Sequence, residues 1–212
     1  MHLIDVKSPT DLKGLSIAEL TDLTAQARQA LMTKVSERGG HCGPPMGVAE
    51  MIMALHYVFN SPVDKIVYDV SHQSYVHKMI TGRALAFLDH NHYNDVTGYT
   101  DPTESEHDFF NIGHTSTSIS LASGLATARN LKGHSENIIA IIGDGSLSGG
   151  EAFEGLDYAA TLDSNMIIIV NDNDQSIAEN HGGLYRGLSE LRKTNGESSN
   201  NIFKSLGLDY RF

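Results

Sequence analysis

The sequence predicts an α/β domain of three layers (α/β/α), in which helices cover both faces of a mostly parallel sheet. Two apolar runs rich in β-branched residues, 138–142 and 166–170, have the length and composition of buried strands. A glycine-rich stretch, residues 143–150, joins the first run to a helical pattern over residues 151–162. Short strands that alternate with helices are typical of such parallel sheets.

Size and hydrophobicity point to one soluble unit. At 212 residues and 40% hydrophobic content, the chain has the size of one ordinary domain with a full core, so we expect a single domain over residues 1–212. Its longest apolar runs fall far short of the roughly 20 residues of a membrane-spanning helix, and its start does not resemble a signal peptide. These features predict a cytoplasmic protein that does not bind membranes.

Charge and cysteine content narrow the classes of ligand. The formal net charge of −11 disfavours general affinity for nucleic acid or for anionic membranes. The single cysteine, Cys42, cannot form an internal disulfide, which agrees with a reducing compartment. An anionic ligand would therefore need a local source of positive charge, such as a metal ion or the N-termini of helices.

The first part of the chain is predicted to be helical. Residues 11–38 carry an amphipathic pattern with a capping box from Ser16 to Glu19, and two glycines end it. Residues 40–47 hold too many glycines and prolines for regular structure, so we predict a loop there. A second helical pattern follows over residues 48–59.

The middle of the chain predicts a short strand over residues 66–70 and helical structure over residues 75–81. Residues 84–112 are polar and lack clear periodicity, which indicates a long surface or active-site loop with one short helix. Residues 113–118 are expected to begin a helix that extends to Asn130. Its hydroxyl side chains are available as N-caps.

The last part of the chain turns polar after the second apolar run. Residues 180–201 are rich in Gly, Ser and Asn, and their composition predicts a mobile excursion without regular structure. Residues 202–206 predict one helical turn, and residues 208–212 predict the start of a strand.

One constellation of polar residues follows the two apolar runs. Asp144 comes directly after the first run, and Asn173, 29 positions further on, follows the second. Neighbouring parallel strands end at the same edge of a sheet, so the two loops are expected to emerge side by side. Their oxygen ligands suit a hard cation such as Mg²⁺, which completes its shell with phosphate oxygens and water.

Three familiar glycine-rich motifs fail at this loop. A dinucleotide fingerprint begun at Gly143 would need Gly or Ala where Ser148 stands, and a phosphate-binding loop of the Walker type would need a lysine that is missing. A calcium loop begun at Asp144 would need Glu where Gly155 stands. The pattern that remains is Gly-Asp-Gly followed by Asn, which is the signature of thiamine diphosphate proteins. The alternative is that the glycines only form a tight turn.

Three of the 11 histidines are functional candidates. His41, His72 and His114 each adjoin glycine or small polar residues in a predicted loop, where no core needs filling. Their intrinsic pKa near neutrality suits proton transfer. Six others are interpreted as ordinary surface or hydrogen-bonded side chains: His56, His90, His92, His107, His134 and His181.

Five blocks of the sequence together resemble the first domain of a known family. Residues 3–28, 39–47, 64–83, 104–120 and 143–177 resemble the 1-deoxy-D-xylulose-5-phosphate synthase family of transketolase-like enzymes. The resemblance implies the thiamine-diphosphate-binding, transketolase-like fold. It also implies thiamine diphosphate and Mg²⁺ as cofactors.

The resemblance also implies roles for particular residues. The implied metal ligands are Asp144, Asn173 and the carbonyl of Gln175. The positions implied to face the cofactor are His72, Gly113, His114, Thr115, Gly145, Ser146 and Asn173. His41 is implied to lie near the reacting carbons, and with His72 and His114 it forms the implied catalytic set.

The implied reaction is the decarboxylation of pyruvate, a 2-oxo acid, and transfer of its two-carbon unit to glyceraldehyde 3-phosphate, a sugar phosphate. This reaction serves isoprenoid and thiamine precursor synthesis. The family needs a pyrimidine-binding domain, supplied in cis or in trans, whose glutamate activates thiamine. That domain and the C-terminal domain are expected to be absent from these residues. By itself the chain is therefore expected to be inactive or nearly so, and a homodimer is expected.

Four departures from the family keep two alternatives open. Residues 43–47, Gly-Pro-Pro-Met-Gly, are closer to the transketolase version of this loop. In addition, Ser71 stands where the family usually has glycine, Thr115 where it has serine, and Gln175 where it commonly has methionine. One alternative is a split transketolase subunit that transfers glycolaldehyde units between sugar phosphates. The other is a non-catalytic module that only binds the cofactor.

Overall fold

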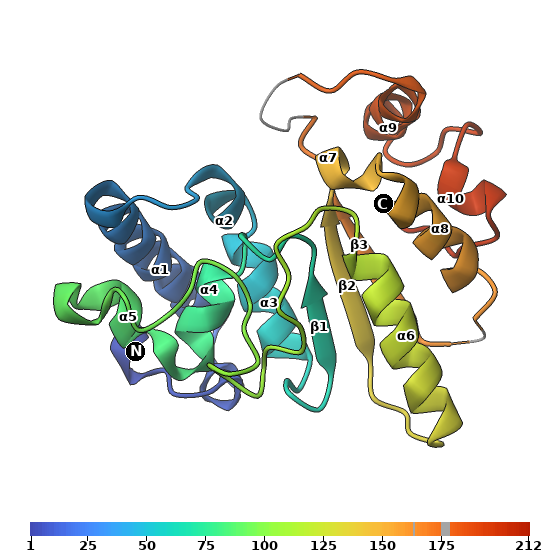
Figure 1. Ribbon diagram of the computed structural model, residues 1–212. Helices are drawn as coiled ribbons and strands as arrows, with labels where there is room; N and C mark the ends of the chain where they lie inside the picture. Colours follow the sequence, from blue (N-terminus) through green and yellow to red (C-terminus); the bar gives the residue numbers. More distant parts are fainter. Residues whose placement is uncertain (163, 175–178) are drawn as a thin grey trace. The chain divides into compact units, whose positions relative to one another are not determined.

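The computed structural model describes residues 1–162, 164–174 and 179–212, which form two compact units, Met1–Gly113 and His114–Phe212 (Figure 1). The first unit is mainly helical and contains one strand. The described residues of the second contain two parallel strands and their helices. That the whole chain acts as one diphosphate-binding domain stays a prediction.

The long N-terminal helix, α1, spans Ile17–Arg38 and has the predicted cap. The Glu19 N–H donates to Ser16 Oγ (3.3 Å), and the Ser16 N–H donates to the Glu19 carboxylate (2.8 Å). Gly39, at φ 76°, ends the helix as expected of glycine in the left-handed region. The helix begins later than predicted because residues 9–12 form a separate 3₁₀ turn.

The other elements of the first unit are short. They are the 3₁₀ turns η1 (Leu3–Asp5), η2 (Pro9–Leu12) and η4 (His90–His92), the π-helical turn η3 (Met79–Arg83), the strand β1 (Lys65–Tyr68) and the helices α2 (Gly43–Gly47), α3 (Ala49–Val58), α4 (Tyr75–Lys78) and α5 (Leu85–Leu88). The second helix, the helical turn after the strand and the long irregular segment with a short helix are confirmed.

Two predictions for this unit were wrong. The segment 40–47 is not all loop, because Pro44 and Pro45 lie in the first turn of α2, where a missing N–H costs nothing and the fixed φ suits a helix. The strand predicted to reach Val70 ends at Tyr68. Val70 and Ser71 have φ values of 58° and 67°, which no strand tolerates.

The first unit contains a buried polar network. His77 Nε2 lies 2.8 Å from an Asp108 carboxylate oxygen, and His77 Nδ1 lies 2.9 Å from His56 Nε2. Arg83 donates to both oxygens of the same carboxylate, at 2.7 and 2.9 Å. Burial by itself would raise the pKa of Asp108, but the hydrogen bonds from His77 and Arg83 lower it below its ordinary value. Asp108 is therefore a charged acceptor for two helical segments.

A second carboxylate extends this network. Glu104 accepts hydrogen bonds from Lys78 (2.5 Å), from Arg83 (3.1 Å) and from the backbone N–H of Thr97 (2.6 Å). Asp108 accepts a further bond from the N–H of Asp101 (2.9 Å). Two carboxylates thus help to hold the irregular segment after α5.

Lowering the pH from 7 toward 5 should destabilise this unit through its buried histidines. Burial lowers the pKa of His77 to about 4, and burial also places the pKa of His56 well below its ordinary value. Below pH 6.5 the unfolded chain therefore binds more protons than the folded chain does. The free energy of unfolding keeps its full value above that pH and falls as the pH drops toward 4. From His77 alone we expect a loss of about 2 kcal/mol between pH 7 and 5.

Urea unfolding followed by circular dichroism across this pH range tests the expectation. The substitution His134→Gln is a matched control, because that side chain is 58% exposed. It should leave the pH dependence unchanged. A flat profile of unfolding free energy between pH 7 and 5 would contradict buried, neutral histidines.

The second unit contains the two strands predicted from the apolar runs. Strand β2 (Ile138–Gly143) pairs in parallel with β3 (Met166–Asn171), in a register that runs from Ile138↔Met166 to Gly143↔Asn171. The other elements are the helices α6 (Ser118–Leu131), α7 (Asp144–Leu147), α8 (Gly150–Ala159), α9 (Gly183–Lys193) and α10 (Ile202–Ser205). The parallel pairing confirms the α/β class.

Helix α6 packs against both strands and against α8 (Figure 1). A Cβ at Gly155 of α8 would lie 3.1 Å from the side chain of Ile119 and 3.1 Å from the backbone nitrogen of Ser120, so only glycine permits this close approach. The expected hydroxyl N-cap of α6 is absent at Thr117. The hydroxyl of Thr117 donates to the His114 carbonyl instead (3.3 Å).

Two predictions for the end of the chain were wrong. Residues 183–193 form α9, because Leu188 and Leu191 are each only 3% exposed and supply an apolar face that the polar composition concealed. In the described residues 208–212 no strand is present, and the Tyr210 ring stacks on Phe203 at 5.5 Å. The helical turn at residues 202–205 is confirmed.

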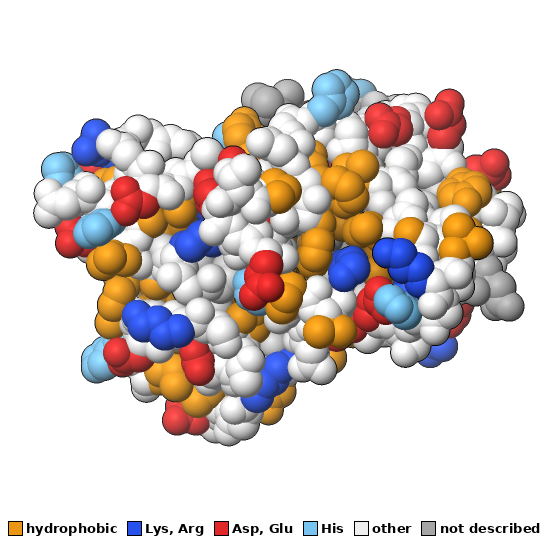
Figure 2. All heavy atoms as spheres, turned by 60° about the horizontal axis from the view of Figure 1, so that its bottom comes forward, with side chains coloured by type: hydrophobic (Ala, Val, Ile, Leu, Met, Phe, Trp, Pro, Cys, Tyr) orange, Lys and Arg blue, Asp and Glu red, His pale blue; other side chains and the backbone are white. Residues whose placement is uncertain are grey.

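Charged side chains of both signs share the surface. On the face shown in Figure 2, acidic and basic side chains are interspersed with hydrophobic ones rather than gathered by sign. None of the helices within the described ranges has the length and apolar character that crossing a membrane requires.

Candidate functional site

The carboxyl ends of β2 and β3 bring the two predicted polar loops to one edge. Gly143 is paired with Asn171, so Asp144 follows the last pair by one residue and Asn173 follows it by two. This arrangement is the one predicted from the two apolar runs. A carboxylate and a carboxamide therefore lie in adjacent loops.

Asp144 has an unusual electrostatic environment. Its side chain is nearly buried, and its Oδ2 accepts a hydrogen bond from Asn180 Nδ2 (2.7 Å). Burial, and next the charge of Asp172, raise the pKa of Asp144 above its ordinary value. An added cation would oppose both effects. The donor set at this edge thus fits a hard divalent ion.

The neighbouring acidic residues share one arginine. Arg192 of α9 donates to Asp172 (2.6 Å) and forms an ion pair with Asp174 (2.6 Å). That arginine therefore compensates the carboxylates on both sides of Asn173. The side chain of Asn173 is exposed.

The glycine-rich loop is more regular than predicted and is tied to the start of α6. Residues 144–147 form one helical turn, α7, and the Ser146 carbonyl accepts a hydrogen bond from Ser116 Oγ (2.7 Å). A Cβ on Gly149 would collide with the Ser116 side chain, so glycine is required there. The hydroxyl of Ser116 thus joins the segment of His114 and Thr115 to the loop of Gly145 and Ser146.

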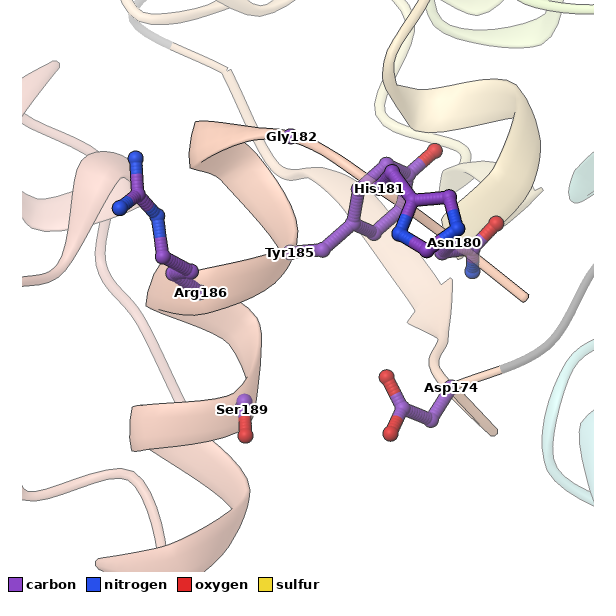
Figure 3. Close-up of a pocket in the computed structure, with 7 residues that line it drawn as sticks. All are labelled: Asp174, Asn180, His181, Gly182, Tyr185, Arg186 and Ser189. Atoms are coloured by element: carbon purple, nitrogen blue, oxygen red, sulfur yellow. The ribbon is translucent and has the colours of Figure 1, made fainter.

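A surface pocket of about 420 Å³ lies beside these loops (Figure 3). It is lined by Asp174, Asn180, His181, Gly182, Tyr185, Arg186 and Ser189. Tyr185 extends from α9 toward Asn180 and His181, whereas Arg186 points away from them (Figure 3). The Tyr185 hydroxyl lies 3.5 Å from the Gly145 carbonyl.

Sequence reasoning missed Ser116, Asn180 and Tyr185 as members of this site. The leucines at positions 184, 188 and 191 follow a helical spacing after Gly182-Gly183. That pattern would have predicted α9, although not the contacts of Asn180 and Tyr185 with the glycine-rich segment. No local signal identifies the partner of Ser116.

Two of the three candidate histidines meet in the first unit. The ring centroids of His41 and His72 are 4.9 Å apart in an edge-to-face arrangement, and Tyr99 lies 5.9 Å from His41. Burial, and next the proximity of His41, lower the pKa of His72 to about 4. His72 is therefore a neutral imidazole at physiological pH.

The remaining candidates lie at the boundary of the units or outside the described residues. Gly113 ends the first unit and His114 begins the second. Gly113, His114 and Thr115 are exposed, and His114 Nδ1 lies 2.7 Å from the Thr115 carbonyl oxygen. Gln175 is not among the described residues.

The metal assignment stays a prediction. Within residues 1–162, 164–174 and 179–212, no group of three or more His, Cys, Asp or Glu side chains is arranged to hold a metal. The predicted ligands are one carboxylate, one carboxamide and one backbone carbonyl. Two of these three ligands, the carboxamide and the backbone carbonyl, do not belong to His, Cys, Asp or Glu side chains.

Parallel strands that end in polar, glycine-rich loops and are packed against helices make this chain an α/β protein of the transketolase-like class. The sequence model of the family described as 1-deoxy-D-xylulose-5-phosphate synthase matches residues 3–207. The chain belongs to the 1-deoxy-D-xylulose-5-phosphate synthase family.

Individual relatives agree with this assignment. The chain is 52% identical over 190 residues to the 1-deoxy-D-xylulose-5-phosphate synthase of Caldanaerobacter subterraneus subsp. tengcongensis, covering 90% of this chain and 30% of the relative. It is 49% identical over 192 residues to the enzyme of the same name from Symbiobacterium thermophilum, covering 91% and 30%. The chain therefore spans about 30% of the length of the curated relatives it matches.

Proposed function

We propose that this chain is the cofactor-binding part of an enzyme with 1-deoxy-D-xylulose-5-phosphate synthase activity, which condenses pyruvate with glyceraldehyde 3-phosphate and releases CO₂. The observation that carries the proposal is the register of β2 and β3, which brings the Asp144 and Asn173 loops to one edge of the sheet in a chain of this family.

Asp144, Asn173 and the carbonyl of Gln175 are the groups that would hold Mg²⁺. Asn173 would also contact the cofactor, as would Gly145 and Ser146 in α7, which lie beside the metal ligand in sequence. The bound ion would offset the negative charge of the diphosphate and of Asp144. When bound, thiamine diphosphate supplies the carbon nucleophile and the electron sink for decarboxylation.

The histidines would manage protons and orientation. His72 is neutral at physiological pH, so it can accept a proton or a hydrogen bond without first losing a charge. His41 lies in edge contact with it, near the place where the substrate carbons are expected. His114 and Thr115, with Gly113, would contact the cofactor.

Further parts are needed for the whole reaction. The thiamine-activating glutamate and most contacts to the sugar phosphate would come from a pyrimidine-binding domain, in cis or in trans. We also propose a homodimer that acts in the cytoplasm.

The decisive assay is CO₂ release from pyruvate by the whole enzyme that carries this chain. We expect release that depends on thiamine diphosphate, Mg²⁺ and glyceraldehyde 3-phosphate. Turnover of ketose phosphate donors without any pyruvate turnover would support a split transketolase, which the Gly43–Gly47 segment favours. Binding of thiamine diphosphate with Mg²⁺, detected by calorimetry, without turnover of either donor would support the non-catalytic module that only binds the cofactor.

A further inference from the structure

Ser71 adjoins the histidine pair and has a costly backbone conformation. Its φ is 67°, and that of Val70 before it is 58°. A residue other than glycine in the left-handed region costs about 1–2 kcal/mol, and a β-branched residue is more strained still. Such strain persists only where the surrounding contacts enforce it.

The hydroxyl of Ser71 supplies two such contacts. It is completely buried, donates to the Ile112 carbonyl (2.8 Å) and accepts from the Thr100 N–H (2.9 Å). Thr100 Oγ1 in turn donates to the Phe110 carbonyl (2.8 Å). One side chain therefore joins two stretches of the irregular segment to the turn that carries His72.

These ties hold the residue that follows Tyr99. Tyr99 precedes Thr100 and contacts the ring of His41. The backbone N–H of His41 donates to Tyr75 Oη (3.4 Å). The His41 ring therefore contacts Tyr99, whose neighbour Thr100 is held by the Ser71 hydroxyl.

We propose that Ser71 is a positioning residue, whose hydroxyl holds the Tyr99–Thr100 stretch against His41 and so keeps this stretch packed on the His41–His72 pair and the two rings correctly spaced. The contribution of this residue to catalysis rests on the function proposed above. Its effect on the histidine pair does not.

The variants Ser71→Gly and Ser71→Ala separate the hydroxyl from the backbone strain. Both lose the two hydrogen bonds, but only glycine adopts the left-handed conformation without cost. Ser123→Ala is the matched control, because Ser123 is also a buried serine and lies in the other unit.

Two measurements on the 212-residue chain test the proposal. In both Ser71 variants, hydrogen exchange at the Thr100 amide should accelerate at least about tenfold, while amides in β1 keep their protection. The titration midpoint of His72 by NMR should rise from about 4 toward 6.5 as water reaches the ring. Ser123→Ala should change neither quantity.

Kinetics of the whole enzyme supply a third readout. For Ser71→Gly we expect kcat to fall about tenfold with KM for pyruvate within about twofold, because the loss concerns alignment rather than substrate contact. Wild-type exchange and titration in both variants would overturn the proposal, as would a change confined to Ser71→Ala, which would implicate strain. An inactive wild-type enzyme would refute the proposed function, while exchange and titration would still decide the role of Ser71.

Discussion

Replacing Asp108 with alanine should lower the free energy of unfolding by about 3–5 kcal/mol. The Asp108 side chain is fully buried and accepts hydrogen bonds from Arg83, from His77 and from the Asp101 backbone. Its removal leaves the Arg83 guanidinium, which is only 11% exposed, short of a counter-charge. It also removes the bonds through which Asp108 joins the irregular segment to His77 of α4 and Arg83 of η3.

Urea unfolding measured by circular dichroism at pH 7 provides the test. Asp108→Asn keeps the shape of the side chain and should lose less stability than Asp108→Ala, so it serves if the alanine variant does not fold. Asp209→Ala is the control, because the side chains of Asp209 and of its ion-pair partner Arg211 are 80% and 85% exposed. This variant should change the free energy of unfolding by less than about 0.5 kcal/mol. A loss below about 1 kcal/mol for Asp108→Ala would show that the network is not needed.

Asp144→Ala should abolish the Mg²⁺-dependent binding of thiamine diphosphate, with an affinity loss of more than about 100-fold. The carboxylate is the proposed anionic ligand, and Asn173 in the adjacent loop has no charge to replace it. The fold should survive the change. Because burial raises the pKa of Asp144, its charge is destabilising in the folded protein, and the variant should unfold no more easily than the wild type.

Isothermal titration calorimetry with and without Mg²⁺ measures this effect directly. Asp157→Ala is a suitable control, because this aspartate is exposed on α8 and outside the two loops. It should bind as the wild type does. Unchanged affinity in Asp144→Ala, with the Mg²⁺ dependence intact, would refute the metal assignment.

Elements encoded by nearby residues could be predicted from the sequence. The capping box of Ser16 and Glu19 and the apolar runs 138–142 and 166–170 each carry their signal within a few positions, and all three formed as expected. The same local logic failed at α9. There, the polar composition received more weight than the spacing of Leu188 and Leu191.

The candidate site was predictable only in part. Asp144 and Asn173 were identified because each follows a recognisable strand, and a parallel sheet places such ends together. By contrast, nothing near Asn180 or Ser116 in the sequence indicates that one bonds to Asp144 and the other to Ser146. Both contacts join residues at least 30 positions apart.

The sequence by itself therefore determined the α/β class and the family. The tertiary structure decided the register that aligns the two loops, the buried carboxylate of Asp108 and the hydroxyl bridge of Ser71. The physical reason is that helix and strand signals depend on neighbours within one or two turns of chain. Buried polar bonds depend instead on which distant segments the core brings together.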